Sequence, residues 1–132
     1  MDQQFISTSI PFYIKAAQLT LDLAFWGVLL SLGIGFLCAV IEYWKVPFLR
    51  LLARGYIEVS RNTPLLIQLF FLYYGFAKIG FKFEAYTCAV FGLAFLGGSY
   101  MAEAIRAGLE SVSQLQIEAG LSIGLRPCQL LR

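Results

Sequence analysis

The feature that most constrains this chain is an apolar run in which no charged residue occurs from Leu23 to Ile41. The stretch around it, from residue 16 to residue 41, is apolar except for four polar side chains. About 20 predominantly apolar residues cross the hydrocarbon core of a bilayer as a helix. The sequence therefore predicts a first transmembrane helix over 16–41. Asp22 lies near its first end, where its carboxylate reaches the interface, and this placement is favoured over a functional role.

Composition supports a membrane protein. The 132 residues are 59% hydrophobic and 14% charged, with 12 Phe and 7 Tyr. A soluble domain is typically about 45–50% apolar and about 25% charged. These values exclude both an ordinary soluble domain and a disordered chain, because so apolar a chain buries more than enough surface to become ordered.

Few residues suit catalysis, metal binding or nucleic-acid binding. The chain has no histidine, which removes the commonest general base and the commonest metal ligand. Cys38, Cys88 and Cys128 are far apart, so we expect small apolar side chains in helices and no metal site or disulfide. The net charge of +2 is too small to suggest a nucleic-acid partner, and no cofactor or catalytic residue is expected.

A second span is predicted over about 57–77, with a break inside it. Arg61, Thr63 and Pro64 mark the break, since Thr63 can cap a helix whose first position is Pro64. We expect an interfacial helix over 48–60 that leads into a span over 64–76. Irregular backbone at membrane depth is tolerated only where protein or a water-filled cavity satisfies it, so the break is a candidate functional element. A plain helix kink remains the alternative.

A third span is predicted over about 85–105, and its small residues indicate close helix packing. Gly92, Gly97, Gly98 and Ser99 lie inside it. The first span has a more regular stripe of small residues, which recur every four positions at Gly27, Ser31, Gly35 and Ala39. Small residues let helix backbones approach closely in lipid, so we expect these faces to contact other helices.

The distribution of Lys and Arg predicts the orientation. Seven of these residues fall between the first two spans or after the third, and three fall on the other side. Cytoplasmic loops carry the excess of positive charge. The N-terminus is therefore predicted outside and the C-terminus in the cytoplasm.

The segment after the third span predicts a short helix. Ser113 is followed three residues later by Gln116, a capping-box pattern, and Gly124 is a natural terminator. We expect a helix from Gln114 to about residue 123, which either docks on a soluble partner or lies on the membrane surface. A further helix would begin at Pro127, five residues before the end, so the chain is expected to be incomplete.

The residues are similar to those of the membrane subunit, or permease, of bacterial ATP-binding-cassette importers for polar amino acids of the histidine, glutamine and arginine type. One likeness is Glu118-Ala119-Gly120 with Gly124 four residues on, which resembles the EAA motif of that family. Two upstream stretches also resemble the family in the same order: Ser99 to Glu103 with Arg106 to Gly108, and Tyr56 to Val59 with Arg61 to Gln68.

The resemblance implies the front portion of a five-span permease domain that extends over 1–132, incomplete at its C-terminus. It departs from the family pattern at Gly120, which replaces an Ala, and at Asn62, which stands where Gly is usual. It implies all-α architecture with three transmembrane helices, and an EAA-type loop over about 113–126 that couples to a cytoplasmic ATP-binding subunit.

The resemblance also implies partners and a location. These are a second permease subunit in a homo- or heterodimer, an extracytoplasmic amino-acid-binding protein, and the lipid of the bacterial cytoplasmic membrane. Within the coupling loop, Glu118 either accepts hydrogen bonds from the ATPase or braces its own loop. Glu103 and Tyr100 are possible substrate-pathway residues, and the alternative for Glu103 is an interface ion pair with Arg106.

Two other classes of protein share some of these features with an amino-acid importer subunit. A small three-span scaffold or assembly protein shares the composition, and only the ordered motifs and the abrupt end separate the two. An intramembrane enzyme is weaker, because Ser31 and Ser99 have no obvious base nearby. No GxxxxGK[ST] phosphate loop occurs, so the chain itself is not expected to bind nucleotide.

Overall fold

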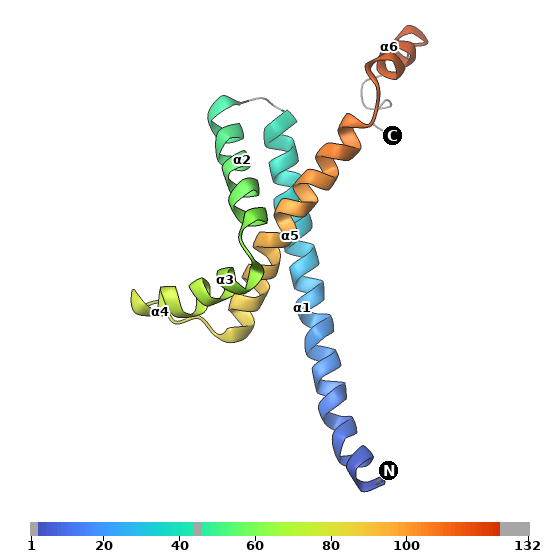
Figure 1. The fold of residues 1–132 in the computed structure, drawn as a ribbon. Coiled ribbons are helices and arrows are strands. Elements are labelled where there is room, and N and C mark those ends of the chain that lie inside the picture. The colour runs from blue at the N-terminus through green and yellow to red at the C-terminus, as the bar shows by residue number, and fades with distance from the viewer. Residues whose placement is uncertain (1–2, 44–45, 125–132) are drawn as a thin grey trace.

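A computed structural model describes residues 3–43 and 46–124, and these residues are mostly helical (Figure 1). The first helix, α1 (Gln3–Tyr43), is longer than predicted, because it begins well before residue 16 and runs through Pro11. Its 41 residues span about 60 Å at 1.5 Å per residue, roughly twice a hydrocarbon core of about 30 Å. The predicted span 16–41 is thus one part of a longer rod.

The predicted second span is divided into helices that run in different directions. The helix α2 (Pro47–Asn62) lies beside the C-terminal part of α1, and α3 (Leu65–Phe70) leaves it sideways (Figure 1). A π-helical turn, η1 (Phe71–Gly75), and a short α4 (Phe76–Lys78) continue from α3. The predicted break inside 57–77 is therefore confirmed, since α2 ends at Asn62 and α3 begins at Leu65.

The remaining helices are α5 (Ala85–Glu110), which covers the predicted third span, and α6 (Gln114–Ser122), which corresponds to the predicted loop helix. A turn at Gly80, whose φ is +97°, leads toward α5. By length and composition, two helical segments of the described chain are able to cross a membrane, Ser9–Glu42 and Ala85–Glu110. The segment Leu65–Lys78 is apolar but shorter.

The crossing of α1 and α5 is built from small residues, as the stripe predicted. A Cβ atom on Gly35 would lie 2.5 Å from the Cβ of Met101 and 2.9 Å from the backbone nitrogen of Ala102. A Cβ on Gly97 would collide with the hydroxyl of Ser31, which donates a hydrogen bond of 2.6 Å to the carbonyl of Gly27. These contacts leave no room for side chains, so glycine sets the distance between the two helices.

The helix α2 packs into the same junction. The buried residues Cys38, Ala53, Ile57 and Ala102 form the core where α1, α2 and α5 meet. Cys38 and Cys88 are free and buried, which agrees with the expectation for these two; Cys128 lies outside the described residues.

Candidate functional site

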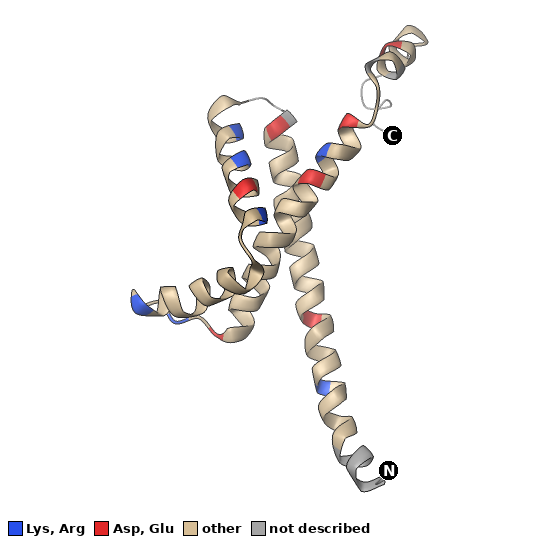
Figure 2. Ribbon diagram, viewed as in Figure 1, with Lys and Arg blue, Asp and Glu red and all other residues tan. Residues whose placement is uncertain are grey.

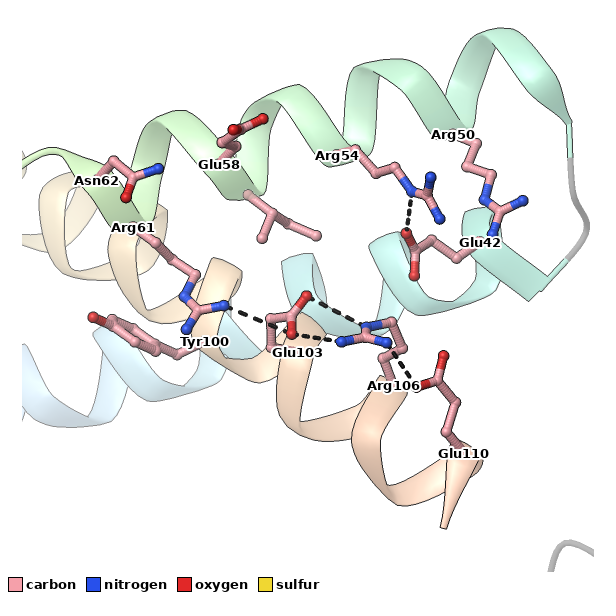
Figure 3. Close-up of a pocket in the computed structure, with 11 residues that line it drawn as sticks. Glu42, Arg50, Arg54, Glu58, Arg61, Asn62, Tyr100, Glu103, Arg106 and Glu110 are labelled. Atoms are coloured by element: carbon pink, nitrogen blue, oxygen red, sulfur yellow. Dashed lines mark hydrogen bonds and ion pairs between the residues drawn. The ribbon is translucent and has the colours of Figure 1, made fainter. Parts of the chain in front are cut away.

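A charged cleft of about 560 Å³ lies between α2, α5 and the C-terminal end of α1 (Figure 3). Four arginines and four glutamates line it, together with an isoleucine, an asparagine and a tyrosine. The lining residues are Glu42, Arg50, Arg54, Ile57, Glu58, Arg61, Asn62, Tyr100, Glu103, Arg106 and Glu110. Figure 2 shows these charges gathered toward one end of the molecule, whereas the long N-terminal part of α1 is almost uncharged.

An ion-pair network joins the two walls of the cleft. Arg106 contacts Glu103 at 2.9 Å and Glu110 at 2.7 Å, nitrogen to oxygen, one helical turn in each direction along α5. Arg61 reaches Glu103 from α2, with 3.6 Å between Nη1 and Oε2. The predicted pair of Glu103 and Arg106 is confirmed, and Arg61 as a second partner of Glu103 was missed.

Tyr100 belongs to the same cluster. The guanidinium carbon of Arg61 lies 5.3 Å from the centre of the Tyr100 ring, a cation–π distance. The tyrosine remains 51% exposed, so its ring borders open space. The structure therefore brings the possible pathway residues Tyr100 and Glu103 together with Arg61, which the sequence alone places only at the helix break.

A second ion pair lies at the other end of the cleft. The Nε of Arg54 donates to Oε1 of Glu42 over 3.2 Å, which ties α2 to the end of α1. The Nε of Arg50, one turn earlier, is buried and has no hydrogen-bond partner in the described part of the chain. The cleft thus contains both paired and unpaired charge.

The break between α2 and α3 differs in detail from the prediction. Thr63 is the C-cap of α2, and its hydroxyl donates to the carbonyl of Val59 over 2.8 Å. Pro64 is the residue before α3, which begins at Leu65. Thr63 as the N-terminal cap is therefore wrong, and so is Pro64 at the first helical position, because the chain turns at both residues before the next helix starts.

Gln68 closes the break from within α3. Its Nε2 donates to the carbonyls of Ser60, at 3.0 Å, and Thr63, at 2.9 Å. From the sequence alone, Gln68 is only the last residue of a motif and is not expected to have this role. The signal that could have found it is a long amide side chain one turn after a proline that breaks an apolar helix.

An apolar cavity of about 620 Å³ lies on the other side of the break, between α3, η1 and α5. Aromatic and aliphatic side chains line it, and Gln68 and Thr63 are its polar members. Its lining residues are Ile34, Val59, Thr63, Ile67, Gln68, Phe71, Leu72, Phe76, Phe83, Cys88, Phe91, Ala94 and Phe95. The break thus separates a charged space from an apolar one.

The predicted coupling-loop residues lie on and just after α6, which stands apart from the helix crossing (Figure 1). Glu118 and Ala119 are exposed, and the Glu118 carbonyl accepts a hydrogen bond of 2.8 Å from the hydroxyl of Ser122. Gly120 is within the helix, and Gly124 follows it with a φ of +84°. The helix and its glycine terminator are confirmed, whereas residues 125–126 of the predicted loop and the helix predicted from Pro127 lie outside the described residues.

Other chemistry has little support in the described ranges. No group of three or more His, Cys, Asp or Glu side chains there is arranged to hold a metal ion. Asp22, on α1, accepts a short hydrogen bond from the hydroxyl of Tyr86 on α5. This carboxylate therefore has a structural partner near the middle of α1, away from the charged cleft.

Comparisons with known proteins agree with the motifs. The chain is 38% identical over 135 residues to a probable amino-acid ABC transporter permease protein of Vibrio harveyi, covering 99% of this chain and 60% of that protein. It is 36% identical to the nopaline transport system permease protein of Agrobacterium fabrum, covering 95% of this chain and 56% of that protein. The chain thus spans about 60% of the length of such relatives.

A solved structure has the same fold. The crystal structure of an amino acid ABC transporter with histidines matches all of this chain and 62% of its own chain, with a TM-score of 0.89 and 34% sequence identity. The family model for the binding-protein-dependent transport system inner membrane component matches residues 31–132. The chain therefore belongs to the family of inner membrane components of binding-protein-dependent transport systems, a family of transport components rather than enzymes.

Proposed function

We propose that the chain is the membrane-spanning part of an ATP-binding-cassette importer that carries polar amino acids across the bacterial cytoplasmic membrane. Family membership supports a transport role and an inner-membrane location. The observation that supports polar amino acids as the substrate class is the charged cleft, which is lined by four arginines and four glutamates. An amino acid carries a carboxylate and an ammonium group, and this cleft offers partners of the opposite charge to both.

The pathway residues of this proposal are Tyr100 and Glu103, with Arg61 facing them. Each of these side chains borders the cleft, and Glu103 is shared between two arginines. A carboxylate that is already paired can exchange one arginine for a substrate ammonium group without being left buried and unpaired. Arg61 is then free to contact the substrate carboxylate.

The energy source in this proposal is a separate cytoplasmic ATPase that binds the loop around Glu118 to Gly124. In support, α6 follows α5 after only three residues, Ser111 to Ser113. The short connection places a partner bound to α6 close in sequence to α5, which carries Glu103 at one wall of the cleft. Glu118 is exposed and available to a partner surface.

The topology that fits this mechanism has three spans, with the N-terminus outside and the C-terminus in the cytoplasm. The helices α1 and α5 run in the same general direction, and α2 runs back in the opposite direction beside the C-terminal part of α1 (Figure 1). The C-terminal ends of α1 and α5 lie at the charged end, which would face the cytoplasm under the positive-inside rule. A second permease subunit and an extracytoplasmic binding protein complete the proposed assembly.

A three-span scaffold without transport activity is the alternative function. The two are separated by reconstituting the full chain in vesicles with its ATPase and binding protein, and measuring ATP-dependent uptake of labelled amino acids. We expect saturable uptake of polar amino acids. We also expect the Glu103→Gln variant to show a higher KM for this uptake. Unchanged uptake kinetics in both Glu103→Gln and Tyr100→Phe would overturn the pathway role, and absence of any uptake would favour the scaffold.

A further inference from the structure

The break between α2 and α3 leaves a backbone carbonyl without its usual partner. In a continuous α-helix the carbonyl of Ser60 accepts the N–H of the residue four positions later. That residue is Pro64, which has no N–H. An unpaired carbonyl away from water is expensive, and Ser60 is fully buried.

The side chain of Gln68 supplies the missing donor. Its Nε2 lies 3.0 Å from the Ser60 carbonyl and 2.9 Å from the Thr63 carbonyl, so both amide hydrogens have an acceptor. Two carbonyl neighbours also fix which end of the amide faces the break. The Oε1 is consequently turned away from these carbonyls, and it is buried without a hydrogen-bond partner among the described residues.

The rest of the break is anchored to α5. The hydroxyls of Tyr56 and Ser60 both donate to the carbonyl of Phe95, at 2.6 Å and 3.0 Å. A Cβ atom on Gly98 would lie 2.7 Å from the Tyr56 hydroxyl, so glycine is what admits this approach. The end of α2 is therefore fixed on α5, and the direction of α3 depends on how the next few residues are held.

We propose that Gln68 is a positioning residue that replaces the N–H that Pro64 lacks and thereby fixes the direction of α3 relative to α2. These two hydrogen bonds of Gln68, which we call the clamp, affect the shape of both the charged cleft and the apolar cavity. Arg61 follows Ser60 into the charged cleft, and Gln68 itself lines the apolar cavity. The geometric part of this proposal is independent of transport, and only its effect on uptake rests on the proposed function.

Amide chemistry is required at this position. A glutamate at residue 68 has nearly the same shape, but its carboxylate only accepts hydrogen bonds, so it faces two carbonyls without a donor. A leucine preserves volume and apolar packing but also supplies no donor. Gln68→Glu and Gln68→Leu therefore remove the same two hydrogen bonds in different ways.

The test is a double-mutant cycle, in which substitutions of Gln68 are compared with and without Pro64. Spin labels are placed at Gly55→Cys on α2 and Tyr74→Cys on η1, where the glycine has open space and the tyrosine is 58% exposed. The native cysteines are replaced by alanine. Distance distributions are then measured in the full chain in lipid nanodiscs, for Gln68→Leu and Gln68→Glu with either Pro64 or Pro64→Ala. Gln18→Leu, the same change at an exposed residue of α1, is the matched control.

With Pro64 present, we expect either Gln68 variant to depopulate the native distance about tenfold, because two hydrogen bonds are lost. With Pro64→Ala, residue 64 can again donate to the Ser60 carbonyl, so a Gln68 substitution removes only the hydrogen bond to Thr63 without replacement, and we expect its effect to be clearly smaller. Gln18→Leu leaves the distribution unchanged.

Equal effects of the Gln68 substitutions in both backgrounds would overturn the proposal, because Gln68 would then act independently of the proline. The absence of any effect with Pro64 present would also overturn it. If Gln68→Leu prevents insertion, the amount of folded protein becomes the measurement: recovery by Pro64→Ala supports the clamp, and failure to recover contradicts it. Loss of uptake plays no part in these outcomes.

Discussion

Arg61 on α2 and Glu103 on α5 lie 3.6 Å apart, nitrogen to oxygen, across the charged cleft. The guanidinium of Arg61 also faces the ring of Tyr100, and the carboxylate of Glu103 is held by Arg106. Both charged side chains are partly exposed, at 43% and 30%. Such a pair contributes only about 0–1 kcal/mol to stability, so substitutions at either residue are expected to affect folding little.

The first prediction concerns this pair. Arg61→Gln and Glu103→Gln are each expected to slow amino-acid uptake, while the midpoint of thermal unfolding changes little. The double variant is expected to be no slower than the worse single variant, because residues that act together are not additive. Uptake in vesicles and unfolding in detergent check this. Lys82→Gln, in the exposed loop before α5, is the control and is expected to leave uptake unchanged. Additive losses would show that the two residues act separately.

The second prediction concerns the crossing of α1 and α5. Gly35→Ala places a methyl group 2.5 Å from the Cβ of Met101, so the helices must separate. We expect it to lower the free energy of unfolding by about 1–3 kcal/mol, as overpacking does. Gly33→Ala is the matched control, since nothing lies within 4 Å of its Cβ. It is expected to be neutral or to stabilise the helix by up to about 1 kcal/mol. Equal effects of the two substitutions on unfolding would contradict this packing.

The third prediction concerns the hydroxyl of Ser60, which is fully buried and donates to the Phe95 carbonyl. Ser60→Ala is expected to reduce the free energy of unfolding by about 1 kcal/mol through loss of this hydrogen bond. Ser111→Ala removes an exposed hydroxyl that bonds to the local carbonyl of Gly108, and it is expected to change stability by less than about 0.5 kcal/mol. Chemical denaturation of the purified protein measures both. The prediction fails if the exposed site proves the more sensitive.

The fourth prediction concerns the coupling loop. Glu118→Lys reverses a charge on exposed α6 and is expected to uncouple ATP hydrolysis from uptake, leaving hydrolysis but lowering the amount transported per ATP. The ratio of uptake to phosphate release in reconstituted vesicles measures this. Glu84→Lys, the same change at the exposed N-cap of α5, lies away from the loop and should retain coupling. A normal ratio for Glu118→Lys would remove this carboxylate from the mechanism.

Several elements were predictable because their signals are local. The break at Thr63–Pro64 follows from a proline in an apolar helix, and the end of α6 follows from a glycine that adopts a positive φ. The small-residue face of α1 follows from its period of four, which places Gly27, Ser31 and Gly35 on one side of the helix. Each of these features depends on residues within one or two turns of one another.

The length of α1 was not predictable in this way. The polar residues of its first turns mark where an apolar span begins, but they do not mark where the helix begins, because helix propensity is a weak signal that the rest of the structure overrides. The positions of Thr63 and Pro64 were not predictable either, because they depend on where the chain changes direction. Thr63 ends α2 as its C-cap, and Pro64 precedes α3 as its N-cap.

The sequence by itself therefore determined which segments are helical and apolar, where the long second segment breaks, and which faces carry small residues. Only the tertiary structure decided the partners: Arg61 with Glu103, Tyr56 and Ser60 with the Phe95 carbonyl, and Asp22 with Tyr86. The physical reason is that helix formation and chain breaks depend on neighbouring residues. Contacts between side chains far apart in the chain depend on how closely the helices cross, and the glycines of α1 and α5 set that distance.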